Sequence, residues 1–199
     1  MGRPVLYVVA GHNGAGKTTL YEEVLASQTA APFVNADRLA LERFGHPAGT
    51  EAESRYGQAE ADGLRDRLMA EGRSLVAEST FSHPSKLDLL DRARALGYRV
   101  LLYHVGLDRP ETAIQRVRAR VLQGGHPVPE DRLRRRFERN RPLIRQAVLG
   151  ADRAFVFDNA DREPLRLALA FKASKVIRRR DPLPAWILEV YAGDLRGAA

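Results

Sequence analysis

Residues 11–18 read Gly-His-Asn-Gly-Ala-Gly-Lys-Thr, which matches the phosphate-binding P-loop pattern of glycine, any four residues, glycine, lysine and serine or threonine. A strand-sized apolar run, Val5–Ala10, leads into this loop, and an amphipathic segment, residues 17–27, leads out of it. Glycines let such a loop turn its backbone amides towards phosphates, and the helix N-terminus adds a favourable dipole. We therefore predict a nucleotide site with Lys17 at the β- and γ-phosphates and Thr18 at Mg²⁺. The predicted nucleotide contacts are Gly11, Asn13, Gly14, Ala15, Gly16, Lys17, Thr18 and Thr19. The alternative is a glycine-rich turn beside a surface lysine.

Strand-like and helix-like segments alternate along the rest of the chain. Short apolar runs predict strands over residues 5–10, 32–35, 75–78, 99–106 and 154–157. Apolar stripes with helical spacing predict helices over residues 17–27, 51–71, 85–96, from 110, 130–148, 164–174 and about 182–192. This alternation indicates an α/β fold, a P-loop NTPase-type three-layer αβα sandwich with a mainly parallel sheet covered on both faces. Since the sequence contains no repeat or linker, we expect residues 1–199 to form a single domain.

Composition narrows the class of protein further. The chain has 199 residues, 44% of them hydrophobic, which is enough for a domain with an ordinary core. It contains no cysteine, so disulfides and cysteine-bound zinc are excluded, and nothing marks an oxidising compartment. The apolar runs are strand-sized, well short of the roughly 20 residues that a membrane helix needs, and the N-terminus lacks the features of a secretory signal. We therefore expect a cytoplasmic protein without a membrane partner.

The net charge of +7 is concentrated in one region. Between Glu111 and Arg145 there are ten arginines and four acidic residues. The two helices predicted here are joined by residues 124–129, Gly-Gly-His-Pro-Val-Pro, and such a pair can close over a bound nucleotide as a lid of about residues 111–145. Guanidinium groups neutralise the charge of a transferring phosphoryl group, and we expect Arg120 and one of Arg135 or Arg136 to do so. The alternative for each arginine is a solvated helix face.

Acidic residues follow two of the predicted strands. Asp37 comes after the strand at 32–35, and Glu78 ends the strand at 75–78 with Thr80 close behind. Because ligands of open α/β sheets lie beyond the carboxyl ends of the strands, we expect these side chains beside the P-loop. Asp37 is the candidate general base for a hydroxyl acceptor, and Glu78 and Thr80 are candidate contacts to the acceptor or to a magnesium-bound water. The alternatives are a helix N-cap for Asp37 and a strand-end ion pair with an arginine for Glu78. We find no convincing Walker-B run, because residues 154–158 come too late in the strand order, so Thr18 is the one predicted metal ligand.

In combination these motifs resemble the zeta toxin family of P-loop kinases. The residues that carry the resemblance are 11–19, Phe33-Val34-Asn35-Ala36-Asp37, Glu78-Ser79-Thr80, Arg120, 124–130, Arg135-Arg136, Phe157-Asp158-Asn159 and, near the C-terminus, Pro184-Ala185-Trp186. The resemblance implies a kinase that uses ATP or GTP with Mg²⁺, an acceptor hydroxyl on UDP-N-acetylglucosamine, and a small antitoxin partner. By matching position it implies Asp37 as the catalytic base, Glu78 and Thr80 as acceptor contacts, and Arg120 with Arg135 or Arg136 as phosphate clamps. The chain is shorter than the fuller toxins and has a more compact lid.

Three functions therefore stay open at the level of sequence. The first is a small-molecule kinase whose acceptor is a nucleotide sugar. The second is a kinase of another acceptor, such as a nucleoside, a metabolite or a nucleic-acid end, although we expect no nucleic-acid partner. The third is a nucleotide-dependent switch that binds ATP without an acceptor, in which a partner protein senses the position of the lid.

Overall fold

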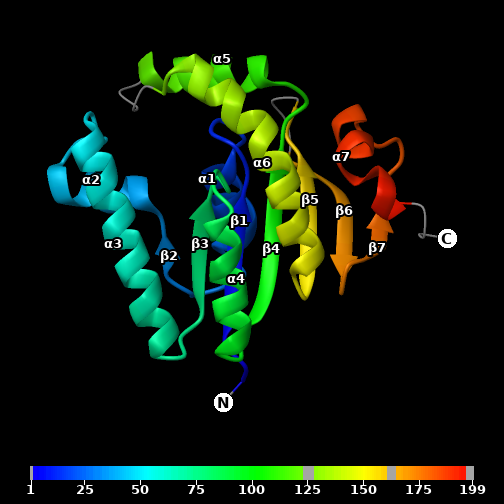
Figure 1. The fold of residues 1–199 in the computed structure, drawn as a ribbon, viewed down its shortest axis with the longest axis horizontal. Coiled ribbons are helices and arrows are strands. Elements are labelled where there is room, and N and C mark those ends of the chain that lie inside the picture. The colour runs from blue at the N-terminus through cyan, green and yellow to red at the C-terminus, as the bar shows by residue number, and fades with distance from the viewer. Residues whose placement is uncertain (1, 123–127, 161–164, 196–199) are drawn as a thin grey trace.

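The computed structural model describes residues 2–122, 128–160 and 165–195. Within them, seven strands form one sheet in the order β2-β3-β1-β4-β5-β6-β7 (Figure 1). The strands are β1 (Val5–Ala10), β2 (Phe33–Val34), β3 (Leu75–Ser79), β4 (Arg99–Gly106), β5 (Arg153–Asp158), β6 (Arg166–Lys172) and β7 (Lys175–Arg179). Strands β1 to β5 are parallel, whereas β6 and β7 are antiparallel additions at one edge. The predicted α/β class with a mainly parallel sheet is confirmed.

Helices connect the parallel strands, and a further helix follows β7. They are α1 (Lys17–Leu20), which continues into the π-helical turn η1 (Tyr21–Leu25), α2 (Ala36–Phe44), α3 (Glu51–Ala70), α4 (Ser85–Ala95), α5 (Pro110–Leu122), α6 (Glu130–Gly150) and α7 (Ala185–Leu195). Local sequence explains several of their ends. Thr50 and Glu53 form a reciprocal capping box that starts α3, and Gly45 ends α2 in the left-handed conformation. No helix in the described ranges combines the length and the apolar character that crossing a membrane requires.

The two faces of the sheet are covered unequally. Side chains alternate along β1, so that Leu6, Val8 and Ala10 join a large core cluster formed with α3, α4, α6 and α7. Val9 points to the opposite face, where α1 and η1 supply Leu20 and Leu25. Figure 1 shows α5 and the start of α6 above the edge at which the parallel strands end, which is also where the P-loop lies. The fold therefore places the P-loop and the arginine-rich helices at the same edge.

The predicted helix at 164–174 is wrong. Residues 165–172 instead form the end of a loop and β6, and β6 pairs with β7 as a hairpin. Leu167, Leu169 and Phe171 alternate with alanines, which is the two-residue period of a strand. The turn residues Ala173 and Ser174 both have positive φ, 46° and 64°, a combination that the type I′ hairpin turn requires. Neither residue is a typical choice for that conformation, which explains why the turn is not apparent from the sequence.

Two glycines offer a matched test of this packing. A Cβ on Gly106, at the end of β4, would lie 2.2 Å from Cη2 of the buried Trp186 side chain. Gly106→Ala should therefore lower the free energy of unfolding by about 1–3 kcal/mol through overpacking. A Cβ on Gly63, inside α3, would meet no atom within 4 Å, so Gly63→Ala should raise it by about 0.5–1 kcal/mol. Urea denaturation of both variants checks that the two changes in the free energy of unfolding have opposite signs. Equal changes in the two variants would contradict the close contact between Gly106 and Trp186.

Candidate active site

The P-loop is held from two sides. Gly14 and Gly16 both have positive φ, 77° and 96°. A Cβ on Gly14 would lie 2.8 Å from the backbone oxygen of Ala113 in α5, and one on Gly16 would lie 2.4 Å from the side-chain nitrogen of Asn159. Asn159, just after β5, also donates a hydrogen bond to the Ala15 carbonyl at 2.7 Å. Both glycines are therefore required by backbone conformation and by close neighbours.

Lys17 and Glu78 face each other across the first residues of α1. The Lys17 ammonium donates to the His12 carbonyl at 3.3 Å and lies 3.4 Å from one Glu78 carboxylate oxygen, and both side chains are largely buried. The Thr18 hydroxyl lies 3.5 Å from the other Glu78 oxygen. The contacts arise because β3 pairs directly with β1, with Val9 opposite Glu78. Glu78 is thus paired with the P-loop lysine, and the alternative of a strand-end pair with an arginine is wrong.

This arrangement suits a magnesium ion. The Thr18 hydroxyl and the Glu78 carboxylate are adjacent hard oxygen donors, which Mg²⁺ prefers. No group of three or more histidine, cysteine, aspartate or glutamate side chains gathers anywhere in the described part of the chain. Mg²⁺ commonly keeps several waters and binds substrate phosphates, so two protein ligands beside a triphosphate site are a sufficient set. The Glu78 carboxylate is therefore a candidate second metal ligand beside Thr18, in place of the Walker-B aspartate that the sequence lacks.

Asn35 connects Glu78 with the start of α2. Its side-chain nitrogen donates to Glu78 at 2.7 Å, and its side-chain oxygen accepts from the Arg38 backbone nitrogen at 2.9 Å, which makes it the N-cap of α2. The N-cap alternative for Asp37 is therefore wrong. Asp37 lies in the first turn of α2, is exposed, and makes no hydrogen bond or ion pair within the described residues. Its carboxylate is available to a ligand at the edge of the sheet where Glu78 lies.

The predicted arginine clamps differ in where they lie. Arg136 of α6 donates to the side-chain oxygen of Asn13 in the P-loop at 3.4 Å. Burial lowers the pKa of Arg136, and the positive charges of Arg132 and Arg139 add to this effect. Arg135 instead forms an exposed ion pair with Asp131. The structure thus brings Arg136, and not Arg135, to the P-loop.

Besides Arg136 and Arg116, which donates to the Ala160 carbonyl, the arginines of α5 and α6 fall into two sets. Five pair with acidic side chains: Arg118 with Glu130, Arg134 with Glu111, Arg135 with Asp131, Arg141 with Glu189, and Arg145 with Asp194. Arg120, Arg132 and Arg139 are exposed and have no acidic partner among the residues that the structure describes. Residues 132, 136 and 139 have the spacing of one helix flank.

Thr80 lies beside α6, where its carbonyl accepts a hydrogen bond from the Asn140 side chain. Residues 123–127 of the predicted lid loop lie outside the described residues.

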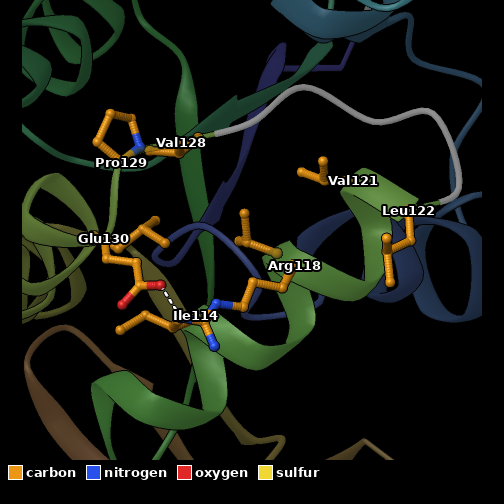
Figure 2. A pocket seen from close by; sticks show the side chains of 9 residues that line it. Ile114, Arg118, Val121, Leu122, Val128, Pro129 and Glu130 are labelled. Atoms are coloured by element: carbon orange, nitrogen blue, oxygen red, sulfur yellow. Dashed lines mark hydrogen bonds and ion pairs between the residues drawn. The ribbon is translucent and has the colours of Figure 1, made fainter.

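An apolar hollow of about 640 Å³ is lined by residues of both α5 and α6 (Figure 2). Its lining includes Ile114 and Val117 of α5 and Leu133 of α6. Figure 2 shows Arg118 and Glu130 joined across it by their ion pair. Ile114 and Val117 of α5 and Leu133 of α6 are each at most 5% exposed and form one small cluster, so the hollow lies beside a direct contact between the two helices.

The chain is similar to known proteins over most of its length. A family model described as Zeta toxin matches residues 1–164. An uncharacterised protein of Haemophilus influenzae is 30% identical over 128 residues, which are 64% of this chain and 88% of that protein.

Solved structures share the fold at low sequence identity. A chain of the crystal structure of AvrRxo1-ORF1:-ORF2 with ATP is similar with a TM-score of 0.69 and 17% identity over 96% of this chain. The present chain spans 63% of that chain's length. A structure of the PezAT chromosomal toxin–antitoxin system of Streptococcus pneumoniae has a TM-score of 0.60 and 15% identity, and the match covers 82% of this chain and 71% of that one.

Proposed function

Because the chain belongs to the zeta toxin family of ATP-dependent kinases, we propose that it transfers the γ-phosphate of ATP to a hydroxyl group of a nucleotide sugar such as UDP-N-acetylglucosamine. One observation carries this proposal. The Glu78 carboxylate contacts Lys17 and Thr18 on the nucleotide side and Asn35 on the other, and Asn35 caps the helix whose first turn holds Asp37. A polar network thus joins the P-loop to the N-cap of α2, and the free Asp37 carboxylate follows in the first turn of that helix.

Each residue has a role in the proposed transfer. The acceptor hydroxyl oxygen forms a bond to the γ-phosphorus, the bond to the β–γ bridging oxygen breaks, ADP leaves, and Asp37 takes the hydroxyl proton. Lys17 neutralises the β- and γ-phosphates, and Arg136 neutralises charge on the transferring group from the side of α6. Thr18 and Glu78 would hold Mg²⁺, which supplies further neutralisation of the phosphate oxygens.

The remaining predicted residues have proposed roles on the acceptor side and in the lid. Thr80 follows Glu78 at the end of β3, where its hydroxyl would contact the acceptor together with the Glu78 carboxylate. Arg120 lies near the end of α5 and would reach the triphosphate when the lid closes. Both assignments rest on the position of these residues in the chain and at the edge of the sheet.

The charge of α6 favours an acceptor that itself carries phosphate. Arg132 and Arg139 flank Arg136 without acidic partners in the described residues, and their charges disfavour the cationic form of Arg136. Unneutralised guanidinium groups in such a row suit a second anionic ligand beside ATP. A nucleotide sugar satisfies this condition through its diphosphate, whereas a neutral sugar does not.

We also propose a protein partner that blocks the nucleotide site. The structurally similar PezAT protein is described as part of a toxin–antitoxin system. A kinase that consumes a nucleotide sugar would need such control in its own cell. Copurification with the product of an adjacent gene, and loss of ATP binding in that complex, would support this partner.

Phosphate transfer tests the proposed activity directly. The chain is incubated with γ-labelled ATP, Mg²⁺ and UDP-N-acetylglucosamine, and labelled nucleotide sugar is separated from free phosphate. Label on the nucleotide sugar supports the proposal. Label only as free phosphate rejects this acceptor and directs the search to nucleosides, metabolites and oligonucleotide ends, with a nucleotide-dependent switch as the remaining possibility.

Neighbouring arginines provide a matched prediction for the clamp. Arg136→Gln should lower kcat by about 10²-fold with a smaller effect on the KM for ATP, because a guanidinium acts most strongly on transition-state charge. Arg135→Gln should stay within about twofold of the wild type, because Arg135 is an exposed side chain paired with Asp131. Steady-state kinetics of the two variants checks the contrast. Equal losses in both would contradict the assignment of Arg136 as the clamp.

A further inference from the structure

Two consecutive residues of the P-loop meet two consecutive residues of α6. The His12 ring packs on the Phe137 ring with centroids 4.3 Å apart and planes inclined by 39°. The next residue, Asn13, accepts the hydrogen bond from Arg136. Since the positions of Arg136 and Phe137 on a rigid helix are coupled, the His12–Phe137 contact fixes how far Arg136 reaches towards the P-loop.

His12 acts here through the bulk of its ring. The side chain is only 3% exposed, and neither ring nitrogen has a hydrogen-bond partner among the described residues. The titratable groups that face it are His104 from β4, Lys17 from α1 and Arg141 from α6, and burial, followed by the interaction with these groups, lowers the pKa of His12 well below its usual range. The ring is therefore uncharged at neutral pH, as a close contact with an apolar ring requires.

Phe137 also contacts the side chain of Arg141. The Arg141 guanidinium lies 4.5 Å from the Phe137 ring centroid, and it donates to the Asp108 carbonyl at 2.9 Å, just after β4. Phe137 thus contacts His12 of the P-loop and the Arg141 guanidinium, which is itself hydrogen-bonded to the backbone just after β4. Removal of the His12 ring would leave a cavity next to Phe137, and α6 would be free to shift relative to the loop.

We propose that His12 is a positioning residue that holds α6 at the distance at which Arg136 reaches the γ-phosphate of ATP. The proposal rests on the proposed function, since it concerns the same nucleotide site. The His12 carbonyl also accepts from the Lys17 ammonium, so His12 contacts one of the two cationic side chains assigned to the phosphates and is linked to the other, Arg136, through the neighbouring Phe137. Nothing in the P-loop pattern itself calls for an aromatic ring at this place, because the four residues after the first glycine are free to vary.

Nucleotide binding without an acceptor tests this role. The affinities of the full chain for ATP and for ADP, both with Mg²⁺, are measured by calorimetry for the wild type, His12→Ala, His12→Phe, Arg136→Gln and the double variant His12→Ala/Arg136→Gln. A clamp on the γ-phosphate gives the wild type a preference for ATP over ADP. We expect His12→Ala to reduce that preference by about tenfold, as far as Arg136→Gln does, with ADP affinity changed by less than about threefold.

The other two variants separate positioning from a general structural effect. His12→Phe keeps a ring of similar size and should retain the wild-type preference, and the double variant should lose no more than Arg136→Gln alone. Additive losses in the double variant, equal losses of ATP and ADP affinity in His12→Ala, or a His12→Phe variant as defective as His12→Ala would each overturn the assignment. Absence of ATP binding by the wild type would instead overturn the proposed function, and thermal unfolding verifies that each variant folds.

Discussion

Replacing Lys17 with alanine should reduce phosphoryl transfer by about 10³-fold or more and strongly weaken ATP binding. The Lys17 ammonium is the cation closest to Glu78 in the described structure, at 3.4 Å, and it is largely buried. Its loss removes the charge that would neutralise the β- and γ-phosphates. It also leaves the Glu78 carboxylate without its cationic partner, so that this negative charge would face the triphosphate.

The measurement compares ATP turnover and ATP affinity in Lys17→Ala with those in Lys175→Ala. Lys175 is an exposed lysine on β7, so its removal changes the net charge equally but leaves the site intact. The control should match the wild type within about twofold, as surface substitutions generally do. Unchanged ATP turnover in a folded Lys17→Ala protein would contradict the interpretation of residues 11–18 as a working P-loop.

The central fold is predictable because its signals are local. The P-loop needs a strand before it and a helix after it, and the apolar runs of β3 and β4 are bounded by glycines and polar residues. At the C-terminal edge the signals conflict. Residues 164–174 are rich in leucine and alanine, which favour helices. Pairing of β6 with β5 and β7 outweighs this local preference and stabilises a strand.

For the candidate site, the sequence predicts which residues lie at the ends of the strands beside the P-loop, but not all of the contacts between them. Asp37, Glu78 and Thr80 lie at or just after the carboxyl ends of parallel strands, so the pattern predicts them at the edge where the P-loop lies. The neighbour that makes the network, Asn35, has a sequence signal, because asparagine before a helix start is a preferred N-cap. The pairing of Glu78 with Lys17 has no such signal, because it depends on β3 lying directly beside β1.

The choice between Arg135 and Arg136 could not be made from the sequence. Consecutive helical residues point about 100° apart, so the facing residue depends on how α6 is rotated against the sheet. That rotation is set by buried side chains such as Phe137 and Ile144. His12 was missed for a related reason, since its importance comes from a contact with a residue 125 positions later in the chain.

Asp37→Asn should leave ATP affinity unchanged within about twofold and reduce transfer to the acceptor by 10²–10⁴-fold, on the order of what general bases contribute. Asparagine keeps the size of the side chain and removes its capacity to take a proton. Asp37 makes no hydrogen bond or ion pair within the described residues, so the fold does not depend on it. Loss of a favourable charge in the first turn of α2 should cost only about 0.3–1 kcal/mol of stability.

Glu42→Gln is the matched control, since Glu42 is an exposed acid on the same helix more than one turn further on. Labelled product, free phosphate and ATP affinity are measured side by side for both variants. Loss of transfer with intact ATP binding in Asp37→Asn alone supports a kinase with Asp37 as its base. Transfer that survives in Asp37→Asn would mean that another group takes the proton. Wild-type ATP binding without transfer to any acceptor would favour a nucleotide-dependent switch, because such a protein needs Lys17 and the lid but has no use for a base beyond the end of β2.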